Sequence, residues 1–281
     1  MSRRISSCCL LLALPWSALF YSTVPAIGQD IKIRTHVHSV EKTPDGPTKT
    51  EQSVSLTIFH AGRVYDYIDN VREVIIFEPA HNRFRIISLP RSLVTTVGFE
   101  ELRQMLSVAE HAIGNYIERA EKEHNGQTPE SARALRFQLE PNFKENWKPV
   151  SKELQLTNAK FRYNVKCETC EDAAIHEIYL QYADWMSQLN FVLHPQSMYP
   201  NSRLALNEAL RQRKLYPLEV QLFSDENPDS SLVASHTISW KLNSFDRTMI
   251  NDWESQLGQG KLREVTFHEY QEAVLIAAAR K

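Results

Sequence analysis

Glycine is scarce in this 281-residue chain: there are only eight, spread singly along it. That scarcity argues against a glycine-rich repeat or linker. The fragment closest to a phosphate-binding loop, Gly258-Gln-Gly260-Lys261, lacks the leading glycine spacing and the Ser or Thr after its lysine. It also follows a predicted helix instead of a strand, so no nucleotide-binding loop is expected.

A charge excess of one sign is also missing, because the formal net charge is only −2. No basic stripe points to nucleic acid, and no long acidic tail points to disorder. The chain is therefore expected to be a globular protein without a nucleic-acid partner.

Recognisable catalytic and metal-binding motifs are absent. No serine lies in a Gly-x-Ser-x-Gly elbow. His176-Glu177 and His268-Glu269 resemble the start of a zinc-protease helix, but neither has the second histidine four residues after the first. The sequence therefore predicts no catalytic residues, no metal ligands and no cofactor, and it leans towards a protein that is not an enzyme.

Long hydrophobic runs are confined to the N-terminus. Two arginines precede an apolar run over residues 8–20, which Pro15 interrupts, and small residues follow at the positions that a signal peptidase reads. A membrane-spanning helix needs about 20 apolar residues, more than this run supplies. We expect a cleaved signal peptide over 1–28 and a single exported domain over 29–281, in the periplasm or cell envelope. An uncleaved anchor and a lipidated form are the alternatives.

Cysteine is nearly absent once the signal peptide is removed, because only Cys167 and Cys170 remain. Two cysteines exclude a four-cysteine zinc site. The acidic neighbours Glu168, Glu171 and Asp172 disfavour the thiolate that redox chemistry needs. An oxidising compartment favours a Cys167–Cys170 disulfide, with a reducible, redox-active or metal-linked pair as alternatives.

Alternating apolar and polar residues dominate the first third of the mature chain. In residues 52–60, we expect Val54, Leu56 and Ile58 to point inward, and Ser53, Ser55 and Thr57 to point outward. A polar connection is expected over 41–51 and a tight turn at Ala61-Gly62. Short strands with close turn signals predict an antiparallel meander. Its strands are expected at 31–40, 52–60, 63–68, 73–78, 83–89 and 92–97.

The periodicity then changes to three and four, which predicts a long helix from Phe99. Because strands and helices follow in blocks and do not alternate, a parallel doubly wound sheet is not expected. The fold class is predicted as α+β, with a curved antiparallel sheet and helices on its concave face. Further strands are expected at 153–157, 160–165, 218–223 and 232–242, and further helices after Pro129, near 175–189 and 204–210, after Ser244 and at 267–280.

Several side chains are candidates for a functional role. The helical stripe Tyr179, Tyr182 and Trp185 is typical either of a packed core or of a ligand cavity. His236 lies on an apolar strand face, which favours a hydrogen-bonded core histidine. His36 and His38 share a face with basic residues and are expected at the surface. Carboxylates such as Asp66 and Asp69 lie at strand ends and turns, an arrangement common in sheet proteins.

The segments Phe59–Tyr67 and Val74–Pro79 resemble the strand–turn–strand segments of periplasmic lipoprotein-carrier-like proteins. The wider layout also resembles a set of exported bacterial proteins of unknown function. The resemblance implies a strongly curved antiparallel sheet with helices filling its concave side, and it supplies no catalytic or binding residue.

The sequence therefore leaves three functional hypotheses. The first is a non-enzymatic exported protein that binds an apolar small molecule or lipid between sheet and helices. The second is an exported hydrolase without a recognisable motif. The third is an interaction or scaffold protein of the cell envelope.

Overall fold

The computed structural model describes residues 30–194, 197–225 and 227–278. The predicted signal peptide, residues 1–28, lies outside the described residues, so its cleavage stays a prediction. Within the described part of the chain, no helix is long and apolar enough to cross a membrane.

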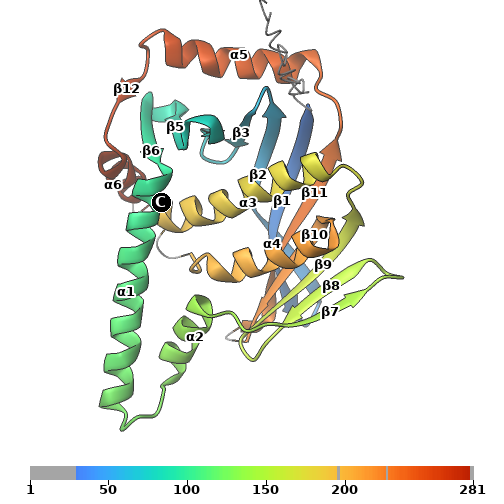
Figure 1. The fold of residues 1–281 in the computed structure, drawn as a ribbon, viewed down its shortest axis with the longest axis vertical. Helices are drawn as coiled ribbons and strands as arrows, with labels where there is room; N and C mark the ends of the chain where they lie inside the picture. Colours follow the sequence, from blue (N-terminus) through green and yellow to red (C-terminus); the bar gives the residue numbers. More distant parts are fainter. Residues whose placement is uncertain (1–29, 195–196, 226, 279–281) are drawn as a thin grey trace, which may run out of the picture.

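Twelve strands of the described chain form one open, curved sheet, against which the helices pack (Figure 1). The strands are β1 (Ile31–Thr43), β2 (Gly46–His60), β3 (Arg63–Ile68), β4 (Glu73–Glu78), β5 (Arg83–Ser88), β6 (Leu93–Gly98), β7 (Lys144–Lys148), β8 (Glu153–Thr157), β9 (Phe161–Thr169), β10 (Leu215–Ser224), β11 (Asn227–Ser239) and β12 (Arg263–Glu264). The helices are α1 (Phe99–Glu123), α2 (Glu130–Leu139), α3 (Ala173–Leu193), α4 (Asn201–Arg213), α5 (Ser244–Gly258) and α6 (Phe267–Ala278). The predicted α+β class is confirmed.

The strand order is β12-β6-β5-β4-β3-β2-β1-β11-β10-β9-β8-β7. Every neighbouring pair is antiparallel except β12 and β6, which run parallel. The first strand, β1, lies in the middle, paired with β2 on one side and with β11 on the other. The predicted meander β2–β6 thus forms one half of the sheet, and later strands complete the other half.

The hairpin turns explain the regularity of the meander. Ala61 and Gly62 both have positive φ, at 49° and 74°, which matches the two-residue turn that best fits the twist of paired strands. The predicted polar connection over 41–51 is wrong, because β1 and β2 remain paired up to Thr43 and Gly46. That tip is exposed on both faces, so its residues show no apolar alternation.

Both faces of the sheet are covered by helices. One face, here called the inner face, packs against α1, α3 and α6 through a core that includes Phe59, Phe77 and Phe99. The opposite face packs against α5, whose Ile250 and Trp253 are buried there. The helices were all expected on the concave face of the sheet, but α5, which was itself predicted, packs on the opposite face.

The second helical layer reverses the predicted orientation of β2. Leu56 and Ile58 belong to the core under α5, on the face opposite to α3. Ser53, Ser55 and Thr57 point to the inner face, where they line a cavity. Polar side chains are tolerated on that face because the space above them is not filled by protein.

Smaller differences concern exposed or short elements. The strands β7 and β12 were not predicted, since β7 is largely exposed and β12 has only two residues. Helix α5 is capped by Asn243 instead of Ser244, because Asn243 and Asp246 form a reciprocal capping box.

Candidate functional site

A cavity of about 580 Å³ separates the inner face of the sheet from α3 and α4. Its floor is contributed by six neighbouring strands, from β3 to β9, and its roof by α3, the start of α4 and the segment between them. Six strands at a spacing of about 4.8 Å make a floor about 24 Å wide. The cavity is therefore elongated across the sheet. Leu232 on its wall is 44% exposed, so the cavity opens to solvent.

The roof is built from one face of α3. Asp172 caps the helix by accepting hydrogen bonds from the backbone amides of Ala174 (2.9 Å) and Ile175 (3.1 Å). Tyr179 and Tyr182, on the face below, line the cavity. The third residue of the predicted aromatic stripe does not line it.

Trp185, that third residue, belongs to the core between helices. Its ring stacks on Phe99 at a centroid distance of 3.9 Å. The guanidinium carbon of Arg103 lies over the Trp185 ring, 5.0 Å from its centroid. The predicted stripe thus divides into two cavity residues and one core residue, and the sequence had left both possibilities open.

The floor carries a band of hydroxyl groups among apolar side chains. Thr35 of β1 is paired with Ser55 of β2, and Ile33 is paired with Thr57. All four residues line the cavity, together with Ser53. Small polar side chains leave room above the floor and supply hydrogen-bonding groups to whatever occupies it.

Asp66 is a buried carboxyl group in the floor, on β3. Thr57 Oγ1 donates to Asp66 Oδ1 at 2.8 Å. Burial raises the pKa of Asp66, although hydrogen bonds with Thr57 and Tyr182 act to lower it. Asp69, the other carboxylate considered from the sequence, lies exposed in the next turn, so the two do not form a pair in the cavity.

His236 of β11 faces the cavity from the opposite half of the floor. Its Nδ1 lies 2.9 Å from Thr35 Oγ1, while its buried Nε2 has no hydrogen-bond partner among the described residues. Burial lowers the pKa of His236 to about 4, and the positive charge of Arg203 adds to that effect. The histidine is therefore neutral at pH 7, and only one of its two ring nitrogens has a hydrogen-bond partner among the described residues.

This lowered pKa predicts an acid-sensitive stability. Between pH 6.5 and 4 the unfolded chain binds a proton at His236 before the folded chain does, so stability is lost as the pH falls. We expect the free energy of unfolding to drop by about 1–3 kcal/mol more in the wild type than in His236→Asn between pH 7 and pH 4. Urea denaturation at several pH values measures this difference. Parallel pH profiles for the two proteins would contradict the assignment.

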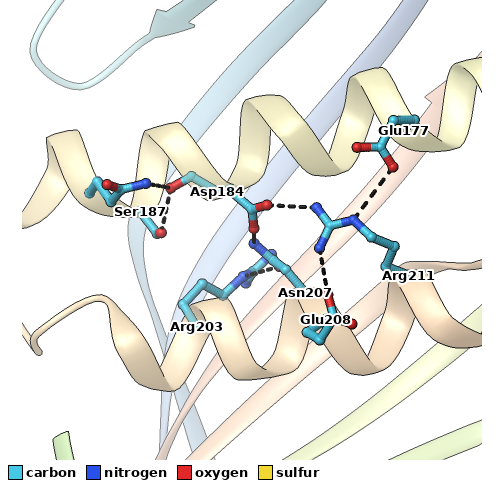
Figure 2. A network of polar contacts seen from close by, with 8 residues as sticks. Glu177, Asp184, Ser187, Arg203, Asn207, Glu208 and Arg211 are labelled. Atoms are coloured by element: carbon cyan, nitrogen blue, oxygen red, sulfur yellow. Dashed lines mark hydrogen bonds and ion pairs between the residues drawn. The ribbon is translucent and has the colours of Figure 1, made fainter. Parts of the chain in front are cut away.

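A polar network fixes α4 to α3 beside the cavity (Figure 2). Asp184 of α3 accepts hydrogen bonds from Asn207 Nδ2 at 2.7 Å and from Arg211 Nη2 at 2.6 Å. Asn207, which is fully buried, in turn accepts from Arg203 Nε at 3.0 Å through its Oδ1. The network sets the position of Arg203, whose side chain lines the cavity.

The two cysteines are buried and do not line the cavity. The two thiols are not joined in the structure, and their sulfur atoms face the carbonyl oxygens of Val165 (3.7 Å) and Asp172 (3.2 Å). Burial raises the pKa of Cys167 to about 12 and also raises that of Cys170. Such thiols are poor nucleophiles, which argues against redox catalysis. The Cys167–Cys170 disulfide stays a prediction.

The remaining histidine candidates do not converge. His36 and His38 stack at 6.3 Å on β1, where both are half-buried. His176 is buried and its Nε2 lies 2.9 Å from the carbonyl oxygen of Leu215, a structural contact. His268 is exposed beside Glu272. Among residues 30–194, 197–225 and 227–278, no three His, Cys, Asp or Glu side chains gather as a metal site would require.

Sequence reasoning missed the contribution of α4 to the site. Ser202 and Arg203 occupy its first turn, and the sequence identified only the apolar residues Leu204, Leu206 and Leu210 there. A serine and an arginine at the start of a helix look like ordinary surface residues until the helix is placed against α3. Comparison of the chain with protein-family models and with curated proteins finds no match.

Proposed function

We propose that this protein is an exported, non-enzymatic binding protein whose ligand is an apolar chain of lipid type. The ligand would lie in the cavity between the sheet and the helices α3 and α4. Export rests on the signal peptide predicted from the sequence, and binding rests on the cavity.

The observation that carries the proposal is the open cavity of about 580 Å³. Small-molecule sites typically occupy about 300–1,000 Å³ and combine mostly apolar walls with a few placed polar groups. The cavity has this character, since Ile33, Ile68, Met186 and Val220 line it beside the hydroxyl band. The cavity opens to solvent, so a ligand can reach this space from outside the protein.

The shape of the cavity favours a long, narrow ligand. The floor crosses six strands, whereas the roof consists mainly of one helix and the first turn of another. A flexible hydrocarbon chain follows such a curved path, and its burial is favourable by about 0.8 kcal/mol per methylene group.

A hydrolase fits the cavity less well. Asp66 lies on β3 and His236 on β11, and the strands β2 and β1 separate them. Three strand spacings place the two side chains about 14 Å apart across the sheet. A general base and the residue that orients it need hydrogen-bonding distance, so these two groups cannot act as a catalytic pair.

Fluorescence titration with cis-parinaric acid tests the proposal. We expect saturable binding of one molecule per chain to the mature wild type. Ala183→Trp places an indole in the roof of the cavity, because Ala183 lines it. That variant should bind the probe at least tenfold more weakly, since the indole and the hydrocarbon chain compete for the same space.

The matched control is Gln181→Trp, which adds the same indole two residues earlier on the exposed face of α3. Its affinity should equal that of the wild type. Equal affinity for all three proteins would show that the probe binds elsewhere, and no binding to the wild type would refute the proposal.

A further inference from the structure

One end of the cavity is built around the first turn of α4. Ser202 and Arg203 both line the cavity there. The first backbone amides of a helix have no partner within it, and the helix dipole adds partial positive charge at that end. Helix α4 has 13 residues, so the dipoles of several turns add up. Its N-terminus therefore places partial positive charge at this end of the cavity.

The charge of Arg203 is not neutralised by a carboxylate of the described residues. In the part of the chain that the structure describes, Arg203 forms no ion pair, whereas Arg211 on the same helix pairs with Glu177, Asp184 and Glu208. The contact of Arg203 Nε with the neutral side chain of Asn207 holds the guanidinium without cancelling its charge. An arginine positioned in this way is suited to a planar or tetrahedral anion.

Two buried polar atoms near Arg203 have no hydrogen-bond partner among the residues that the structure describes. Ser202 is only 1% exposed, and its Oγ makes no hydrogen bond within the described chain. The same is true of His236 Nε2. A buried polar group without a hydrogen-bond partner lowers stability by about 1–3 kcal/mol. A ligand in the cavity that hydrogen-bonds to both atoms would recover this free energy. When the Thr35 hydroxyl donates to Nδ1 of the neutral ring, Nε2 carries the proton and can donate.

Nearby carboxylates are either occupied or distant. Both carboxylate oxygens of Asp184 already accept hydrogen bonds, one from Asn207 and one from Arg211. Asp66 lies three strands from His236, at the other end of the floor. Glu110 of α1 receives the Tyr199 hydroxyl at 3.4 Å and is exposed. The cavity therefore has a positive end at Arg203. Its other end is lined by apolar side chains and by Asp66.

We propose that the acidic head group of a single-chain amphiphile, a carboxylate or a phosphate monoester, binds at Ser202, Arg203 and His236. This inference rests on the proposed function and adds the charge and the direction of the ligand. The head group accepts hydrogen bonds from the guanidinium, the Ser202 hydroxyl and His236 Nε2, and the hydrocarbon chain extends over the floor towards Ile33 and Ile68.

The test is competition for bound cis-parinaric acid by four ligands with the same dodecyl chain, used below their micelle concentrations. These are dodecanoate, dodecyl phosphate, dodecanol and dodecyltrimethylammonium. The wild type should prefer at least one anion to dodecanol by at least tenfold, and it should bind the cation most weakly. The stronger of the two anions identifies the head group.

Arg203→Gln should remove the preference of anion over alcohol and leave the affinity for dodecanol within about twofold. Arg203→Lys should keep part of it, and Ser202→Ala should reduce it. Arg133→Gln, which removes an exposed arginine paired with Glu130, should leave every affinity unchanged. The comparison of anion with alcohol in the wild type remains decisive even where a variant folds poorly.

Equal affinity of the wild type for anion and alcohol would overturn this inference and leave the proposed function standing. An anion preference that persists in Arg203→Gln would place the head group elsewhere. Failure of all four ligands to compete, together with no binding of the probe, would overturn the proposed function itself.

Discussion

Replacing Asp184 with alanine is expected to lower the free energy of unfolding by about 2–4 kcal/mol and to weaken ligand binding. The substitution leaves the buried amide of Asn207 without its acceptor and removes the 2.6 Å ion pair with Arg211. Asn207 also holds Arg203 at the cavity, so loosening α4 should disturb the site as well as the fold. Urea denaturation and the dodecanoate competition measure the two effects.

Glu208→Ala is the matched control, because Glu208 pairs with the same Arg211 from an exposed position on α4. Exposed ion pairs contribute little, so a change of less than about 0.5 kcal/mol is expected. If the two variants lost similar stability, Asp184 would be one more surface carboxylate and the network of Figure 2 would not hold α4 in place.

Replacing Trp253 with alanine is expected to cost about 3–5 kcal/mol of stability and to leave ligand affinity unchanged. Trp253 is buried on α5, and its ring stacks on Tyr65 at 6.2 Å and on Tyr67 at 5.9 Å. These tyrosines lie on the face of the sheet opposite to the cavity. A large cavity would therefore open in the outer core without touching the proposed site.

Phe245→Ala on the same helix is the control, since Phe245 is 68% exposed and should change stability by less than about 0.5 kcal/mol. Thermal denaturation of the variants, followed by titration at a temperature where each is folded, separates stability from affinity. A tenfold loss of affinity in Trp253→Ala would mean that the two faces of the sheet are coupled.

Local patterns were sufficient to predict most of the secondary structure. Alternation and close turn signals gave β3 to β6, and the positive φ values at Ala61 and Gly62 show why that turn was recognisable. The pairing of β1 with β11 could not be predicted in the same way. It joins residues about 200 positions apart, and nothing in either strand alone specifies its neighbour.

Sidedness was harder to predict than secondary structure. In β2 the apolar residues Leu56 and Ile58 were expected to face the main helical layer, but they face α5. The rule that apolar residues point inward assumes one core. Here the sheet has two, and the polar row Ser53, Ser55 and Thr57 faces the cavity between sheet and helices.

The candidate site was predictable only in part. His236 was expected on an apolar strand face, and Tyr179 and Tyr182 on one helical stripe, from their spacing alone. Arg203 and Ser202 were not identified, because their role depends on where α4 docks. That position is set by the buried Asn207, whose contact with Asp184 joins two helices and leaves no periodic signal in the sequence.

Native mass spectrometry of the mature chain, purified from cells without detergent, measures whether a ligand occupies the cavity. We expect one bound amphiphile per chain in the wild type and in Gln181→Trp, and a ligand-free chain in Ala183→Trp. A wild-type chain that carries no ligand after purification, and takes up none when fatty acid is added, would contradict lipid binding in the cavity.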